Sequence, residues 1–127
     1  MTSRLELLPI DVAGEWRPGG GDEYESLYPA TGEPVARLRA ASPKDVDEAI
    51  TGADRAFRRS GWAQMLPHAR AAVLHRVAAL IRERAEDLAQ KQRLDNGKPI
   101  GETRALVASA AGTFQYFAAA LETLEEA

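Results

Sequence analysis

Apolar side chains recur every three or four positions through the second half of the chain, which is the spacing of one face of an α-helix. Pro67 opens the first run, and the pattern predicts a helix over residues 67–95, either continuous or broken along its length. A second run predicts a helix over residues 101–125, with an apolar stripe made of Leu106, Ala110, Phe114, Phe117, Leu121 and Leu124. Burying this stripe represents on the order of 10 kcal/mol, so the helix needs a surface to pack against.

A third helix is predicted over residues 43–59. Ser42 is suited to cap it, Pro43 takes the first helical position and Asp45 follows three residues after the cap. Acidic residues in its first turn and arginines in its last turn complement the helix dipole, so they need no catalytic explanation. Its apolar face is formed by Val46, Ala49, Ile50, Ala53 and Phe57.

Short β-prone segments, rather than a helical pattern, fill residues 5–40. A strand ending in a turn is predicted over Leu5 to Val12, and a hairpin over residues 23–27 and 34–40. Residues 17–22 include three consecutive glycines and are predicted to be a flexible connector. They do not indicate a phosphate loop, because no helix opens after them and the G-x-G-x-x-G spacing is missing.

Composition places the chain among ordinary globular proteins of one domain, with 127 residues, 45% apolar and 28% charged. The net charge is −3 with the signs interspersed, so no nucleic-acid partner is indicated. No apolar run approaches the roughly 20 residues that span a bilayer, and the amino terminus lacks the pattern of a signal peptide; we expect a cytoplasmic protein without a membrane partner. The absence of cysteine excludes a cysteine nucleophile within these 127 residues.

The segment Leu94–Pro99 is a helix stop. Gly97 can take the left-handed conformation that ends a helix, Lys98 suits the negative end of the helix dipole, and Pro99 cannot continue the hydrogen-bond ladder. Alone, this Asn-Gly-Lys-Pro run is a common turn sequence. It gains meaning from three further segments, which are Tyr28–Glu33, Ala41–Ala49 and Arg70–Leu74.

These segments, in this order and at this spacing, make the chain resemble the amino-terminal part of the NAD(P)-dependent aldehyde dehydrogenase superfamily from roughly Gly14 to Ala120. The resemblance implies an α/β family fold with a Rossmann-type NAD domain. Residues 1–127 are then a truncated, mainly helical part of the cofactor-binding domain with an amino-terminal β-hairpin. The helices form a supporting layer over the nucleotide-binding sheet, and the catalytic and oligomerisation domains are absent.

The family chemistry that the resemblance implies lies outside this sequence. In the family, a cysteine thiolate attacks the aldehyde, hydride passes to NAD or NADP, and a glutamate-activated water hydrolyses the thioester. The nucleophile, the general base and the nucleotide loop come later in the family's sequence. We therefore predict that this chain is inactive alone and has no catalytic or cofactor-binding residue of its own.

Some family members hold a structural monovalent cation, and the resemblance implies where K+ or Na+ would bind. The matching positions are Ser26, Leu27 and Asp95, through a hydroxyl or carbonyl, a backbone carbonyl and a carboxylate respectively. A polar cap at the helix end is the alternative role of Asp95. Tyr28 departs from the family pattern, because asparagine usually precedes the proline there.

Two functions stay open at this point. The first is the amino-terminal fragment of an enzyme that oxidises an aldehyde to a carboxylic acid, with the missing carboxy-terminal half or a homologous subunit as its partner. The alternative is a non-enzymatic helical interaction module or non-catalytic subunit that docks through residues 102–126, where self-association is also predicted. A self-sufficient enzyme has no support, because no nucleophile and base pair is indicated.

Overall fold

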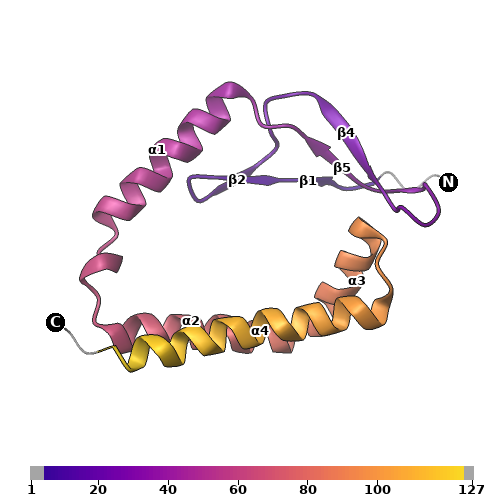
Figure 1. The fold of residues 1–127 in the computed structure, drawn as a ribbon. Coiled ribbons are helices and arrows are strands. Elements are labelled where there is room, and N and C mark those ends of the chain that lie inside the picture. Colours follow the sequence, from indigo (N-terminus) through magenta and orange to yellow (C-terminus); the bar gives the residue numbers. More distant parts are fainter. Residues whose placement is uncertain (1–4, 125–127) are drawn as a thin grey trace. The chain divides into compact units, whose positions relative to one another are not determined.

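The computed structural model describes residues 5–124 and divides the chain into two compact units, Met1–Ala63 and Gln64–Ala127. The first unit contains short strands and helix α1 (Pro43–Arg59), and the second contains the helices that follow it (Figure 1). A short 3-10 helix, Trp62–Gln64, lies at the boundary in the sequence. The remaining helices are α2 (Pro67–Glu83), α3 (Ala85–Asn96) and α4 (Ile100–Glu122).

Two small sheets form the strand region of the first unit. One sheet has the order β1-β5-β4, and the other pairs β2 with β3 in an antiparallel hairpin. The strands are β1 (Leu7–Leu8), β2 (Ile10–Val12), β3 (Glu15–Arg17), β4 (Glu23–Leu27) and β5 (Pro34–Arg39). The antiparallel pair of β4 and β5 confirms the predicted hairpin, whereas the parallel pairing of β1 with β5 was not predicted.

The glycine segment before β4 is anchored, so its prediction as a flexible connector is wrong. Gly19 is buried, and a Cβ atom there would lie 2.3 Å from the carbonyl oxygen of Ala40. The backbone N–H of Gly21 donates to that same oxygen at 2.8 Å. Only glycine allows the two backbone segments to approach so closely, which explains the run of glycines better than flexibility does.

Helix α1 begins as its sequence predicts. Ser42 accepts a hydrogen bond from the backbone N–H of Asp45 at 3.2 Å, and the Asp45 side chain accepts one from the backbone N–H of Ser42 at 2.8 Å. This reciprocal pair is a capping box. The predicted apolar face of the helix is largely exposed, however: Val46 is 46%, Ile50 63% and Phe57 78% exposed.

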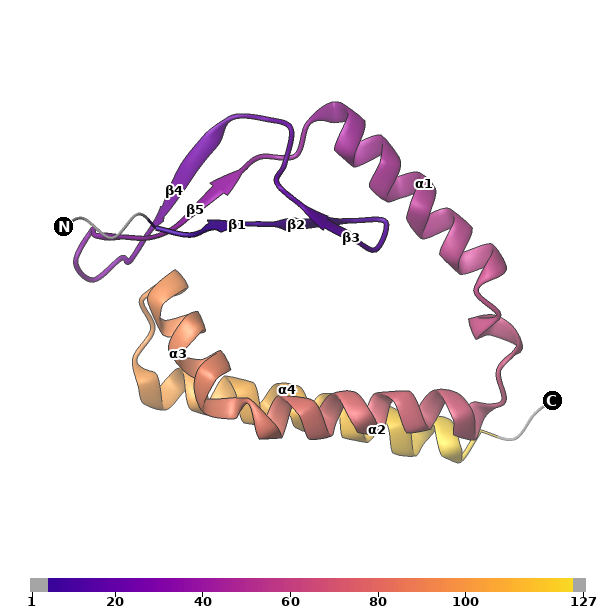
Figure 2. The ribbon, with the colours of Figure 1, turned by 180° about the vertical axis from the view of Figure 1, so that it is seen from behind.

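The second unit packs through small side chains. Helix α4 contacts both α2 and α3, and Figures 1 and 2 show α2 and α4 lying side by side along their length. Its most deeply buried residues are Ala71, Ala78, Ala89, Thr103, Val107, Ala111 and Ala118. Alanines let the helix axes come close together, but they leave the larger apolar side chains outside this contact.

The helix boundaries of the second unit differ in part from the prediction. Residues 67–95 form two helices, which is the broken alternative of the prediction, because Arg84 leaves the helical conformation between α2 and α3. Gly97 has a φ of 74°, and its N–H donates to the carbonyl of Arg93, which confirms the predicted stop. Helix α4 ends at Glu122, and the predicted end at residue 125 lies outside the described residues. Within residues 5–124, no helix is both long and apolar enough to cross a membrane.

Candidate functional site

The largest candidate site is an apolar face on the α2–α4 helix pair. Leu106, Phe114 and Phe117 of α4 and Leu124 just beyond its end are 39%, 38%, 58% and 63% exposed, although they belong to the stripe that the sequence predicts to be buried. On α2, a half-buried line of apolar side chains runs beside the buried alanines. We define the apolar face as these residues together: Leu106, Phe114, Phe117 and Leu121 of α4, Leu124 just beyond its end, and Leu74, Val77 and Ile81 of α2.

Polar contacts mark the opposite side of the same helix pair. His75 Nε2 lies 3.2 Å from Glu122 Oε1, and Arg82 donates to the side-chain oxygen of Gln115. Helix α3 adds a bidentate pair on this side, in which Arg104 donates to Glu86 at 2.8 and 2.9 Å. That pair holds the pKa of Glu86 at about 2, mainly through the hydrogen bonds from Arg104 and with a further bond from Gln90.

Helical spacing explains why the polar contacts and the apolar face lie on opposite sides. Successive residues turn by about 100°, so a residue four positions after a buried one shifts to one side and a residue three positions after it shifts to the other. On α2, His75 follows the buried Ala71 by four positions, whereas Leu74 follows it by three. One side of the pair is therefore polar and bridged, and the other is apolar and uncovered within residues 5–124.

The first unit contains a polar cluster that the sequence analysis missed. Asp45 is only 7% exposed and accepts hydrogen bonds from the Ser42 hydroxyl at 2.7 Å, the Gly20 N–H at 2.9 Å and Arg17 Nη2 at 3.0 Å. The same guanidinium nitrogen also donates to Glu48. Arg17 ends strand β3, so these bonds fasten the strand region and its glycine segment to the start of α1.

The charges of this cluster are consistent with a fixed structural role. Hydrogen bonds from the Ser42 hydroxyl and from the Gly20 and Ser42 backbone N–H groups hold the pKa of Asp45 well below its usual range, and Arg17 adds a smaller Coulombic effect. The hydrogen bond between Arg17 and Glu48 raises the pKa of the former and lowers that of the latter. Every group thus stays charged and paired, which is unlike a general acid or base poised near neutral pH.

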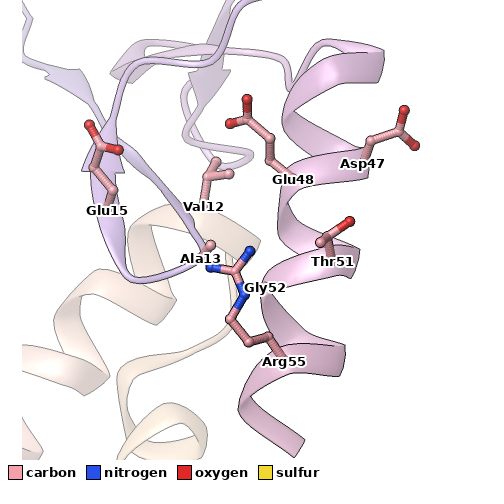
Figure 3. A pocket seen from close by; sticks show the side chains of 8 residues that line it. All are labelled: Val12, Ala13, Glu15, Asp47, Glu48, Thr51, Gly52 and Arg55. Atoms are coloured by element: carbon pink, nitrogen blue, oxygen red, sulfur yellow. The ribbon is translucent and has the colours of Figure 1, made fainter. Parts of the chain in front are cut away.

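A pocket of about 360 Å³ lies where the turn after β2 meets the middle of α1. Figure 3 shows Arg55 reaching toward Ala13 while Asp47 points away from the hairpin. Of its carboxylates, Glu48 is engaged by Arg17. Gly52 and Ala13 form the contact between the two elements, because a Cβ on Gly52 would lie 2.4 Å from that of Ala13. The pocket is lined by Val12, Ala13, Glu15, Asp47, Glu48, Thr51, Gly52 and Arg55.

The predicted cation ligands are divided between the two units. Ser26 and Leu27 lie on β4 in the first unit, at a shift in the β4–β5 register, and Leu27 is opposite Pro34. Proline has no N–H to offer, so the ladder around Leu27 is interrupted. Asp95 lies exposed in the last turn of α3 in the second unit. The three-ligand set therefore stays a prediction.

Comparison with known proteins places these features in a family. Residues 16–127 match the aldehyde dehydrogenase family. A betaine aldehyde dehydrogenase of Rhizobium etli is 49% identical over 100 residues, which are 76% of this chain and 20% of that protein. A betaine aldehyde dehydrogenase of Rhizobium meliloti is 46% identical over 110 residues, which are 84% of this chain and 22% of that protein. The chain spans about a fifth of the length of the curated relatives that it matches.

Solved structures give the same result. An NAD-dependent aldehyde dehydrogenase from Sinorhizobium meliloti is similar with a TM-score of 0.87 and 30% identity, over 96% of this chain and 25% of that one. An aldehyde dehydrogenase from Bacillus cereus in complex with NAD+ is similar with a TM-score of 0.86 and 31% identity, over 94% of this chain and 25% of that one.

Proposed function

The chain belongs to the aldehyde dehydrogenase family, and we propose that it supplies the amino-terminal layer of the cofactor-binding domain of such an enzyme. In this proposal the enzyme oxidises an aldehyde to a carboxylic acid with NAD. The NAD-dependent relative among the solved structures supports the choice of cofactor, and the betaine aldehyde dehydrogenases among the curated relatives make betaine aldehyde the first substrate to test.

One observation carries the proposal, and it is the uncovered apolar face. Phe117 of α4 and Leu124 just beyond its end are more than half exposed, whereas Ala111 and Ala118 of the same helix are fully buried. Each large apolar side chain gains about 1.5–3 kcal/mol when it is fully buried, so a face of this size favours association strongly. We infer that the rest of an aldehyde dehydrogenase, which supplies the cysteine that this chain lacks, covers the face.

Complementation tests the proposal. The chain is co-expressed with the part of the Rhizobium meliloti betaine aldehyde dehydrogenase that follows the matched segment, and NADH formation is measured with betaine aldehyde. We expect activity from the pair and none from either part alone. A folded, co-purified pair that forms no NADH with any aldehyde tried would refute the enzymatic proposal.

A matched pair of variants links this activity to the apolar face. Phe117→Asp places a charge in the face, whereas Ala119→Asp places the same charge at an exposed position on the other side of α4. A buried unpaired carboxylate is strongly unfavourable, so Phe117→Asp should abolish complementation while Ala119→Asp retains it. Equal activity of the two variants would show that the face is not covered in the active pair.

The cation site belongs to the same proposal. Ser26, Leu27 and Asp95 offer the hard oxygen ligands that K+ and Na+ prefer, and the interrupted ladder at Leu27 supports a carbonyl with a free lone pair. We expect K+ to raise the melting temperature of the complemented pair, and Asp95→Asn to remove that increase. A melting temperature that is independent of K+ in the unsubstituted pair would contradict the site.

The second candidate function is a non-enzymatic interaction module or non-catalytic subunit. The exposure of the apolar face favours it as well, because a docking helix presents the same kind of stripe. Complementation distinguishes the two, since an interaction module binds a partner without conferring aldehyde oxidation. Self-association through residues 102–126 is distinguished by the mass of the purified chain at increasing concentration.

A further inference from the structure

Arg70 carries a feature that packing within its own unit does not explain. Its Nε atom is buried, yet it has no hydrogen-bond partner among residues 5–124. A buried charged donor without an acceptor is unfavourable, and such groups are rare in native proteins. The neighbouring Ala71 is fully buried against the other helices, so Arg70 is held at the margin of a packed contact.

Arg70 lies at one end of a line of apolar residues on α2. Arg70, Leu74, Val77 and Ile81 follow one another at spacings of three and four, so they form one line along α2. The three apolar residues of this line are the α2 part of the apolar face, and all four residues are half-buried. Arg70 is therefore the charged end of a surface that is otherwise apolar.

We propose that Arg70 is the polar anchor of the apolar face and binds an Asp or Glu side chain of the polypeptide that covers it. This inference rests on the proposed function, because the occupant is the remainder of an aldehyde dehydrogenase. A guanidinium presents its Nε–H and one Nη–H in parallel, which matches the two oxygens of a carboxylate. Covering the face removes more water from the charge, so the occupant must bring an anion along with its apolar side chains.

The anchor also gives the contact a direction. Helices α2 and α4 run antiparallel, since His75 faces Glu122 and Arg82 faces Gln115. Arg70 precedes His75 and therefore lies toward the carboxyl end of α4. A carboxylate that binds at this end favours one direction of the occupant along the face, which makes an apolar contact more specific.

The test compares four variants of the full chain, three of them on α2, each co-expressed and purified with the remainder of the Rhizobium meliloti enzyme. Arg70→Leu removes the charge and retains an apolar side chain. Arg70→Lys retains the positive charge but lacks the two parallel N–H donors of the guanidinium. Arg76→Leu is the matched control, because Arg76 is exposed on α2 and its nearest carboxylate, that of Glu83, is 3.7 Å away. The dissociation constant of each pair is measured, together with the melting temperature of each chain alone.

We expect Arg70→Leu to weaken the pair at least tenfold, Arg70→Lys to weaken it less, and Arg76→Leu to leave it unchanged. Alone, the Arg70→Leu chain should melt no lower than the unsubstituted chain, because Arg70 Nε has no hydrogen-bond partner among residues 5–124 to lose. The variant Glu125→Gln/Glu126→Gln, which removes the last two acidic residues of the sequence, should bind as the unsubstituted chain does.

Two results would overturn the anchor while leaving the proposed function intact. One is a pair as tight with Arg70→Leu as with the unsubstituted chain. The other is a lower melting temperature of the Arg70→Leu chain alone, large enough to account for its weaker binding, because Arg70 would then act in folding. Failure of the unsubstituted chain to form any pair would instead overturn the proposed function and the anchor together.

Discussion

Replacing Gly52 with alanine tests how the strand region is joined to α1. In the middle of an ordinary helix this substitution stabilises by about 0.5–1 kcal/mol, because glycine loses more conformational freedom on folding. At Gly52 the new Cβ would lie 2.4 Å from the Cβ and 3.1 Å from the Cα of Ala13. Carbon atoms in contact prefer about 3.5–4.0 Å, so the two atoms overlap by roughly 1 Å or more.

The neighbour cannot easily move aside. Ala13 has a φ of 57° in the turn between β2 and β3, so its backbone is held in a region that residues other than glycine rarely adopt. Overpacking of this kind costs about 1–3 kcal/mol, which exceeds the helix gain. We expect Gly52→Ala to destabilise the chain by a net of about 0.5–2 kcal/mol.

The assay is thermal unfolding followed by far-UV circular dichroism, with Gly112→Ala as the matched control. Gly112 lies within α4, and a Cβ there meets nothing within 4 Å, so its substitution should raise the melting temperature by a few degrees. Adding Ala13→Gly to Gly52→Ala removes the clashing methyl group and should restore stability. If Gly52→Ala raises the melting temperature as Gly112→Ala does, the close approach of α1 to the β2–β3 turn is wrong.

Further predictions concern the apolar face and the polar cluster of the first unit. The double variant Leu106→Ser/Phe117→Ser should reduce the fluorescence of a hydrophobic dye without lowering the melting temperature, because both side chains are exposed. Unchanged dye fluorescence would place dye binding elsewhere. The pKa values of Asp45 and Glu86 are depressed, so both carboxylates stabilise the fold above about pH 4. This contribution is lost as the pH falls further. Urea unfolding at several pH values measures the loss. Asp45→Asn should lower stability at neutral pH and flatten this acid dependence, and a variant with the full acid dependence would contradict the role of Asp45.

Helix boundaries could be predicted because their signals are local. The cap at Ser42 and the stop at Gly97 each depend on a few neighbouring residues, and the structure confirms both. The break at Arg84 has no such signal, because neither glycine nor proline marks it. The periodicity of residues 67–95 therefore allows either a continuous or a broken helix, and the structure forms two helices there.

The candidate site was only partly predictable. The spacing of the stripe on α4 indicated a helix in need of a surface, but periodicity could not show that alanines carry the contact with α2 and leave Phe117 outside. The sequence predicts Asp45 as a capping residue that also complements the helix dipole, but not its bond from Arg17, which lies 28 positions away in the sequence. The capping box was the available signal for Asp45, yet it gives no information on burial.

The most direct test of the central claim is dye binding by the purified chain, measured with its mass by light scattering before and after the remainder of the Rhizobium meliloti enzyme is added. The exposed apolar face predicts strong fluorescence of the chain alone and its loss as a complex of one copy of each part forms. A compact monomer that binds no dye, and that does not bind the remainder, would contradict the claim that this face is built to be covered.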